Sequence, residues 1–133
     1  MSDQPSRPAM AMREIREQLG HVEPSTPDVQ VQATHYVVSV LPEGDINRSL
    51  FTINVEYRGD DRWAVVRHRD CLNAAGEWSY EPRPSERDDD WLAEHRFTLG
   101  AALVLAKQAA PHLRVNGHSA VDAYRRTQGE VQR

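Results

Sequence analysis

The sequence contains a single cysteine, almost no lysine and no long apolar run, and each shortage excludes a class of protein. Cys71 alone cannot form an intrachain disulfide, which favours a reducing compartment and predicts a cytoplasmic protein. No stretch has the roughly 20 apolar residues of a membrane-spanning helix, so we expect no membrane partner. Residues 1–8 are polar and no apolar segment follows them, so we also expect no signal peptide.

The shortage of lysine bears on the origin of the gene. Of the 16 basic residues, only Lys107 is a lysine, and the others are arginines. Arginine codons are mostly GC-rich and lysine codons AT-rich, so the bias predicts a high-GC bacterium or one of its phages. The physical alternative is a preference for bidentate pairing by guanidinium groups. The bias runs along the whole chain, which favours the codon explanation.

Length and charge set further limits. A chain of 133 residues corresponds to one domain rather than two. The formal net charge is −4, which excludes a globally basic nucleic-acid binder. We therefore expect a single soluble, mildly acidic domain.

Composition divides the sequence into three segments. We expect an N-terminal arm over 1–34, a core domain over 35–117, and a short C-terminal helix with a tail over 118–133. Residues 21–34 are rich in proline, serine and threonine, so we interpret them as a linker within the arm.

A short amphipathic helix is predicted in the arm over residues 9–20. Met12, Ile15 and Leu19 recur at helical spacing, and Gly20 stands where a helix commonly ends. This helix would present one apolar stripe to a neighbour.

Four strands are predicted in the core domain, separated by short turn sequences. Residues 50–57 alternate apolar and polar side chains, as a strand with one buried face does. Short turns between successive strands imply hairpins and therefore an antiparallel meander. Leu113–Val115 is a candidate fifth strand. The four predicted strands are 35–41, 50–57, 62–69 and 77–81.

A long helix is predicted over residues 86–110, after the strands. Ser85 and Asp88 resemble a capping box, and Pro111 ends the segment. The acidic run Asp88–Asp90 suits a helix start, with a divalent-cation site as the alternative. One apolar stripe would cover the sheet, formed by Trp91, Leu92, His95, Leu99, Ala102, Leu103 and Ala106.

These elements predict an α+β fold. We expect an antiparallel four- to five-stranded meander sheet with one long helix packed on one face, and short helices at both ends.

The long helix also carries a second, weaker apolar strip, formed by Phe97, Ala101 and Val104. A helix that lies on a sheet needs only one stripe, so the second requires another neighbour. We therefore predict a non-enzymatic interaction or assembly module, a homodimer or part of a larger assembly, without a cofactor. The predicted contact residues are this strip together with Met12, Ile15 and Leu19, and secondarily the face that carries Trp63 and Trp78.

Nucleic-acid binding through the sheet is an alternative. Arginines interleaved with aromatic residues can hold a single strand by phosphate contacts and base stacking. Nearby acids, among them Asp60 and Asp61, would instead pair with the arginines across the strands. The residues of this alternative site are Arg62, Trp63, Arg67, Arg69 and Trp78.

An enzyme centred on His95 is the third hypothesis. His95 lies within the main apolar stripe, where it is either a general base in a pocket or a core histidine bonded to a backbone carbonyl or a nearby acid. Cys71 and His68 are three residues apart, but a zinc site needs more ligands and no second cysteine exists. We predict no catalytic residue and no metal site, and we interpret Cys71 as a buried structural residue.

Overall fold

The structure, a computed structural model, describes residues 25–132. The predicted helix over 9–20, with Met12, Ile15 and Leu19, lies outside the described residues. The chain divides into two compact units, Met1–Gln32 and Ala33–Arg133.

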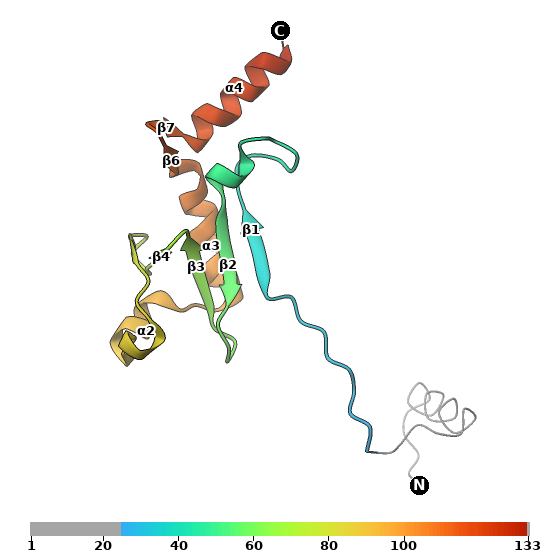
Figure 1. Ribbon diagram of the computed structural model, residues 1–133, viewed down its shortest axis with the longest axis vertical. Coiled ribbons are helices and arrows are strands. Elements are labelled where there is room, and N and C mark those ends of the chain that lie inside the picture. The colour runs from blue at the N-terminus through green and yellow to red at the C-terminus, as the bar shows by residue number, and fades with distance from the viewer. Residues whose placement is uncertain (1–24, 133) are drawn as a thin grey trace, which may run out of the picture. The chain divides into compact units, whose positions relative to one another are not determined.

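The second unit is built on a five-stranded antiparallel sheet whose strands follow the order of the chain (Figure 1). This arrangement confirms the predicted α+β fold and the meander. All four predicted strands form, with shorter ends; residues 50 and 51 belong instead to a 3-10 turn, η1 (Arg48–Phe51). The strands are β1 (His35–Val38), β2 (Ile53–Tyr57), β3 (Trp63–Arg67), β4 (Asp70–Leu72) and β5 (Trp78–Tyr80).

The fifth strand of the sheet is β4, which we did not predict. A tight turn after β3 reverses the chain, and His68 adopts a left-handed φ of 57° in it. The prediction that Leu113–Val115 adds the fifth strand is wrong. Arg114 and Val115 form β6 (Arg114–Val115), which pairs only with β7 (His118–Ser119) in a separate hairpin. Asn116 and Gly117 make its turn with positive φ, as expected for this dipeptide.

The predicted single helix over 86–110 is wrong. Residues 84–86 form a 3-10 turn, η2 (Pro84–Glu86), and two helices follow: α2 (Asp89–His95) and α3 (Leu99–Ala109). Asp88 caps α2 by accepting a hydrogen bond from the Trp91 N–H at 2.8 Å, so capping explains at least this member of the acidic run. Ser85 takes no part in a helix cap.

Residues 96–98 separate the two helices. Phe97 forms a β-bridge with Trp63, and Thr98 then caps α3 by accepting from the Ala101 N–H. The backbone N–H and C=O groups of Phe97 are therefore hydrogen-bonded to β3 instead of to a helix.

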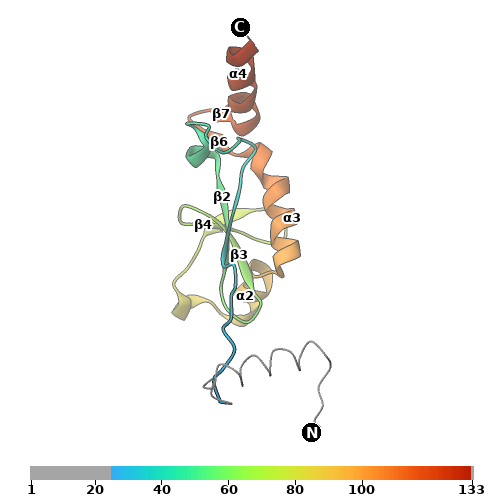
Figure 2. The same ribbon diagram turned by 90° about the vertical axis from the view of Figure 1, so that its right-hand side faces the viewer.

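The break divides the predicted apolar stripe between two faces of the sheet. Figure 2 shows α3 along one face of the sheet. Its residues Ala102 and Ala106 pack in the main core with Trp63 and Val65. The side chains that alternate with these along β3 point to the opposite face. There the side chain of Trp91 from α2 packs against Ala64, Val66 and Cys71.

The C-terminal helix is longer than expected. The helix α4 (Ala120–Gln132) replaces the predicted tail, and Ser119 accepts from the Asp122 N–H at its start. Ala120 and Ala123 belong to the main core, and the 3-10 turn η3 (Ala110–His112) connects α3 to this end of the fold. Within residues 25–132, no helix is long and apolar enough to cross a membrane.

Candidate functional site

An apolar groove lies beside α3. The helix packs on β1, β2 and β3, while β4 and β5 extend the sheet past it. The cavity that results has a volume of about 400 Å³. Its lining is Leu72, Gly76 and Trp78 from the sheet side, and Leu105, Gln108, Ala109 and His112 from the helix side.

Two residues of the predicted contact strip lie along the helical side of this groove. Ala101 is one turn from Leu105, and Val104 is one turn from Gln108, so each is a neighbour of a lining residue on the helix surface. The side chain of Val104 is 54% exposed, and Ala101 is exposed as well. We call this cavity the α3 groove, and we refer to Ala101 and Val104, which lie beside Leu105 and Gln108 on the helix surface, as its rim.

Phe97 does not join this surface. Its side chain is half-buried and packs against the main core, and its backbone is held by Trp63. The helical wheel placed Phe97 beside Ala101 only because it assumed an unbroken helix. Conversely, the floor residues Leu72 and Trp78 could not be assigned to the groove from the sequence, because the floor depends on the β4–β5 hairpin.

The residues of the nucleic-acid alternative are not brought together on one open surface. Trp63 is 5% exposed, and its ring packs against those of Tyr36 and Tyr57 with centroids 5.6 and 5.2 Å away. It therefore offers no face on which a base could stack. Arg67 donates from Nη2 to the carbonyl of Leu50 at 2.9 Å.

The other three residues of that set lie in three different environments. Trp78 lines the α3 groove, whereas Arg62 lines a different cavity. Arg69 is exposed in the turn that connects β3 to β4, where its carbonyl accepts from the Glu81 N–H. The set gives neither a shared stacking platform nor a common groove.

His95 has the surroundings of a core histidine. It is 6% exposed, and its ring stacks on that of Trp91 at a centroid distance of 4.1 Å and an interplanar angle of 6°. Its Nδ1 lies 2.7 Å from the carbonyl oxygen of Trp91. His95 lines neither the α3 groove nor the cavity between the β2–β3 turn and α2. The interpretation as a core histidine therefore fits better than that of a general base.

Cys71 is buried, as expected, while His68 is exposed. Burial raises the pKa of the Cys71 thiol above its ordinary value of 9.0, and Glu81 adds to the increase. The thiol is therefore protonated near neutral pH and is not an activated nucleophile. Among the described residues, no group of three or more histidine, cysteine or acidic side chains is placed to hold a metal ion.

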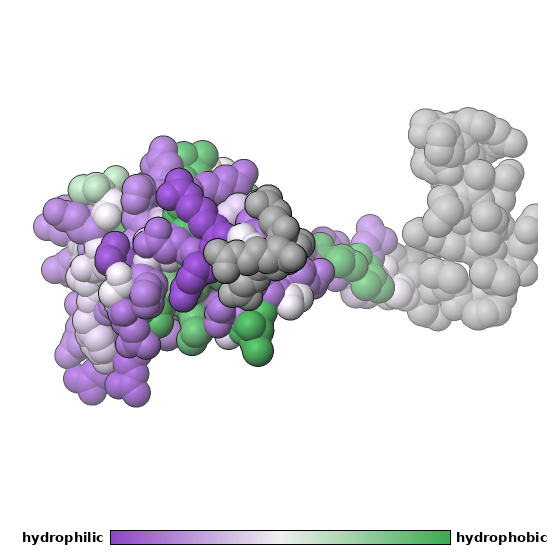
Figure 3. Space-filling model, turned by 90° about the horizontal axis from the view of Figure 1, so that it is seen from above, coloured by the Kyte–Doolittle hydropathy of each residue, from purple (hydrophilic) through white to green (hydrophobic). Residues whose placement is uncertain are grey.

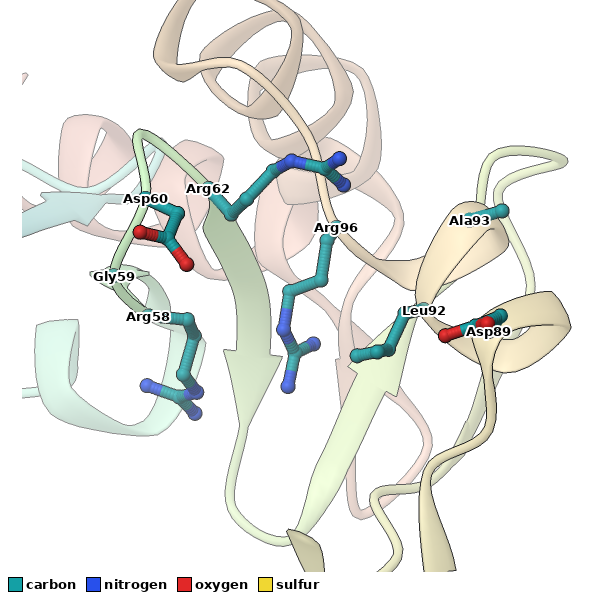
Figure 4. Close-up of a pocket in the computed structure, with 8 residues that line it drawn as sticks. All are labelled: Arg58, Gly59, Asp60, Arg62, Asp89, Leu92, Ala93 and Arg96. Carbon is teal, nitrogen blue, oxygen red and sulfur yellow. The ribbon is translucent and has the colours of Figure 1, made fainter.

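A second cavity, of about 460 Å³, lies between the β2–β3 turn and α2 (Figure 4). In Figure 4 the guanidinium groups of Arg58 and Arg96 point into the same space, whereas Arg62 extends away from it. The lining residues are Arg58, Gly59, Asp60, Arg62, Asp89, Leu92, Ala93 and Arg96.

Glu81 holds the arginines of this region together. Its carboxylate accepts from Arg96 at 2.9 Å and from Arg58 at 3.2 Å, and Arg87 lies 3.7 Å away. Arg58 pairs in addition with Glu56 at 2.9 Å. We call this group the Glu81 cluster.

The Glu81 cluster contains three arginines and two carboxylates, and it joins α2 to the sheet. Burial lowers the pKa of the Arg96 guanidinium more than Glu81 raises it. For Arg58, burial is outweighed by the two carboxylates that it contacts, and the pKa is raised. Asp60 and Asp89 also line the cavity, so its walls carry no large excess of positive charge that would favour an anion.

No protein-family model, curated protein or solved structure matches this chain, so the α3 groove and the Glu81 cluster are interpreted from their own geometry.

Proposed function

We propose that this protein is a non-enzymatic interaction module that assembles with a second copy of itself. In this proposal the α3 groove of one copy receives the apolar stripe Met12, Ile15 and Leu19 of the other. The observation that carries the proposal is the apolar groove beside α3, with Val104 exposed at its rim.

The chemistry of the groove matches that of the stripe. Leu72, Trp78, Leu105 and Ala109 make most of the lining apolar, and such a surface is stabilised when an apolar partner removes it from water. The stripe has residues at positions i, i+3 and i+7, which is the spacing by which a helix inserts side chains into an apolar groove.

The magnitudes favour a reciprocal contact between two copies. Burying three apolar side chains contributes roughly 5–9 kcal/mol, whereas association costs about 4–15 kcal/mol of lost freedom and ordering. One stripe in one groove is therefore marginal by itself. A two-fold symmetric pair contains the same contact twice and incurs the cost of association once.

The linker is long enough for such an exchange. Residues 21–34 can span at most roughly 45–50 Å when extended. This length lets the stripe reach a groove on a neighbouring molecule.

Two observations favour this function over the alternatives. His95 and Cys71 are both buried, so neither is available for chemistry on a substrate. Trp63, the central aromatic residue of the nucleic-acid hypothesis, lies in the core.

Light scattering on the full chain, over a dilution series, tests the proposal. We expect a concentration-dependent dimer that Val104→Glu weakens, because the variant places a charge at the groove rim. Ile46→Glu is the matched control, since Ile46 is an apolar residue with 91% exposure in the loop before η1. A wild-type chain that remains monomeric at every concentration contradicts the proposal.

A disulfide trap identifies the occupant of the groove. Chains with Ile15→Cys are mixed with chains with Gln108→Cys, and each kind alone is the control. We expect an interchain disulfide that forms faster in the mixture than in either control. If the mixture gives no excess, while a chain with both substitutions closes an internal disulfide, the groove is filled by the chain's own arm and the dimer proposal is wrong.

A further inference from the structure

We propose that β1 is a docking edge, on which a second copy of the chain adds its own β1 in antiparallel orientation. The two sheets would then continue into one another across a two-fold axis. This inference rests on the proposed self-association and specifies the surface that aligns the two copies.

The outer edge of β1 has unused backbone groups. Within residues 25–132, β1 pairs with β2 alone. The Tyr57 N–H donates to the carbonyl of Thr34 at 2.9 Å, and this bond determines which residues of β1 hydrogen-bond to β2. Residues of one strand alternate in the side to which their N–H and C=O groups point. The backbone N–H and C=O groups of Tyr36 and Val38 therefore point toward β2. Those of His35 and Val37 point away from β2, to the outer edge of the sheet.

The sequence around this edge carries no charge. No aspartate, glutamate, lysine or arginine occurs between Asp28 and Glu43, although 27% of the chain is charged. Val29 and Val31 are 91% and 95% exposed, and residues 26–34 belong to no helix or strand (Figure 1). Figure 3 shows hydrophobic residues along this segment. Uncharged, alternating and exposed segments next to an edge strand favour strand addition.

The other edge of the sheet has the opposite character. β5 has three residues, Glu77 and Glu81 flank it directly, and Pro82 and Pro84 follow. Short length, charge and proline are the usual protections against pairing at an edge. The contrast indicates that β1 is left open while β5 is blocked.

The alternation makes the segment complementary to a second copy of itself. Val29, Val31, Ala33 and Val37 all occupy odd positions, and odd positions of β1 point to the face that α3 does not cover. When a strand pairs with its own copy about a two-fold axis through a residue, odd positions meet odd positions. With the axis through Ala33, Val29 of one copy lies opposite Val37 of the other, and Val31 lies opposite His35.

The same pairing explains how the N-terminal stripe reaches the other molecule. In an antiparallel pair, the residues that precede β1 in one copy run beside the residues that follow β1 in the other. Each arm is thereby directed onto its partner.

Amide hydrogen exchange on the full chain tests the edge directly. We expect the amides of His35 and Val37 to exchange fast in dilute solution and to become protected as the concentration rises. The amides of Trp78 and Tyr80 in β5 serve as the comparison edge, and we expect no such concentration dependence in them.

A charge substitution provides a second measurement. In Val31→Lys, a lysine occurs on both sides of the symmetric pair, and we expect self-association to weaken about tenfold. Ile46→Lys introduces the same charge at an equally exposed position and is the matched control. Both side chains are almost fully exposed, so neither variant is expected to disturb the fold.

The outcomes separate this inference from the proposed function. A dimer whose His35 and Val37 amides stay unprotected overturns the edge pairing and leaves the α3 groove as the interface. Equal dimerisation by Val31→Lys and Ile46→Lys overturns it as well. A chain that stays monomeric at all concentrations overturns both proposals.

Discussion

The backbone of Phe97 pairs with the backbone of Trp63 through two hydrogen bonds, with N···O distances of 2.8 and 3.0 Å. β4 pairs with β3 only at Val66 and Arg67, so Phe97 can pair with the first part of the same edge of β3. Strand pairing requires an extended backbone at Phe97. For that reason α2 must end before it and α3 must start after it, which places the side chains of the two helices against different faces of the sheet.

Thr98→Ala tests whether α3 begins at this break. In a continuous helix, removing a β-branched residue from the interior would stabilise the protein slightly. Because Thr98 is a helix cap here, we expect the free energy of unfolding to fall by about 1 kcal/mol. Urea unfolding measures whether the free energy of unfolding falls or rises in the variant. Asp88→Ala is expected to show a similar loss and Ser85→Ala almost none, because Ser85 caps no helix.

Glu81→Ala tests the cluster that joins α2 to the sheet. The side chain of Arg96 is 3% exposed, and Glu81 is its only carboxylate partner among the described residues. We expect a loss of about 3–5 kcal/mol in the free energy of unfolding, because a buried guanidinium loses its counter-charge. Glu86→Ala is the control: it breaks the exposed pair with Arg83, for which less than about 1 kcal/mol is expected. Equal effects of the two variants would contradict this role of Glu81.

The fold could be predicted from the sequence where the local pattern determines the structure. Alternating residues in β2 and the Asn116–Gly117 dipeptide were sufficient to place a strand and a turn. β4 escaped prediction because it has only three residues and follows a turn with positive φ at His68, which is not a glycine. The helix break escaped because it depends on Trp63, more than thirty residues away, rather than on the helical segment itself.

The candidate site was predictable to the same extent. The helical spacing of Ala101 and Val104 predicted an apolar strip, and both side chains are exposed beside residues that line the groove. The floor residues Leu72 and Trp78 could not be predicted, because they line the groove only where β4 and β5 extend past α3. No local sequence pattern around them indicates that arrangement. Phe97 was wrongly assigned to the strip, because the prediction assumed an unbroken helix whereas its backbone pairs with Trp63.

The titration of Cys71 gives a pH-dependent prediction. Burial raises the pKa of this thiol above 9.0, so the folded state binds the proton more tightly than the unfolded chain does. The resulting stabilisation is complete below pH 9.0 and is lost as the pH rises through the folded pKa. Between about pH 8 and about pH 10, we expect the wild type to lose more stability than Cys71→Ala. Parallel curves for the two proteins in chemical denaturation would contradict the prediction.

Filling the α3 groove separates its role in association from its role in folding. Ala109 is half-buried and lines the groove, so Ala109→Phe directs a large apolar side chain into space that the proposed partner stripe would occupy. The added ring gains apolar contacts within the chain, so we expect the free energy of unfolding of the monomer to be unchanged or higher. Dimerisation measured by light scattering should nevertheless be lost, because the groove is already filled. Leu105→Ala is the opposite change and is expected to lower the stability of the monomer, since it enlarges the cavity. If Ala109→Phe folds normally and still dimerises like the wild type, the groove is not the docking surface.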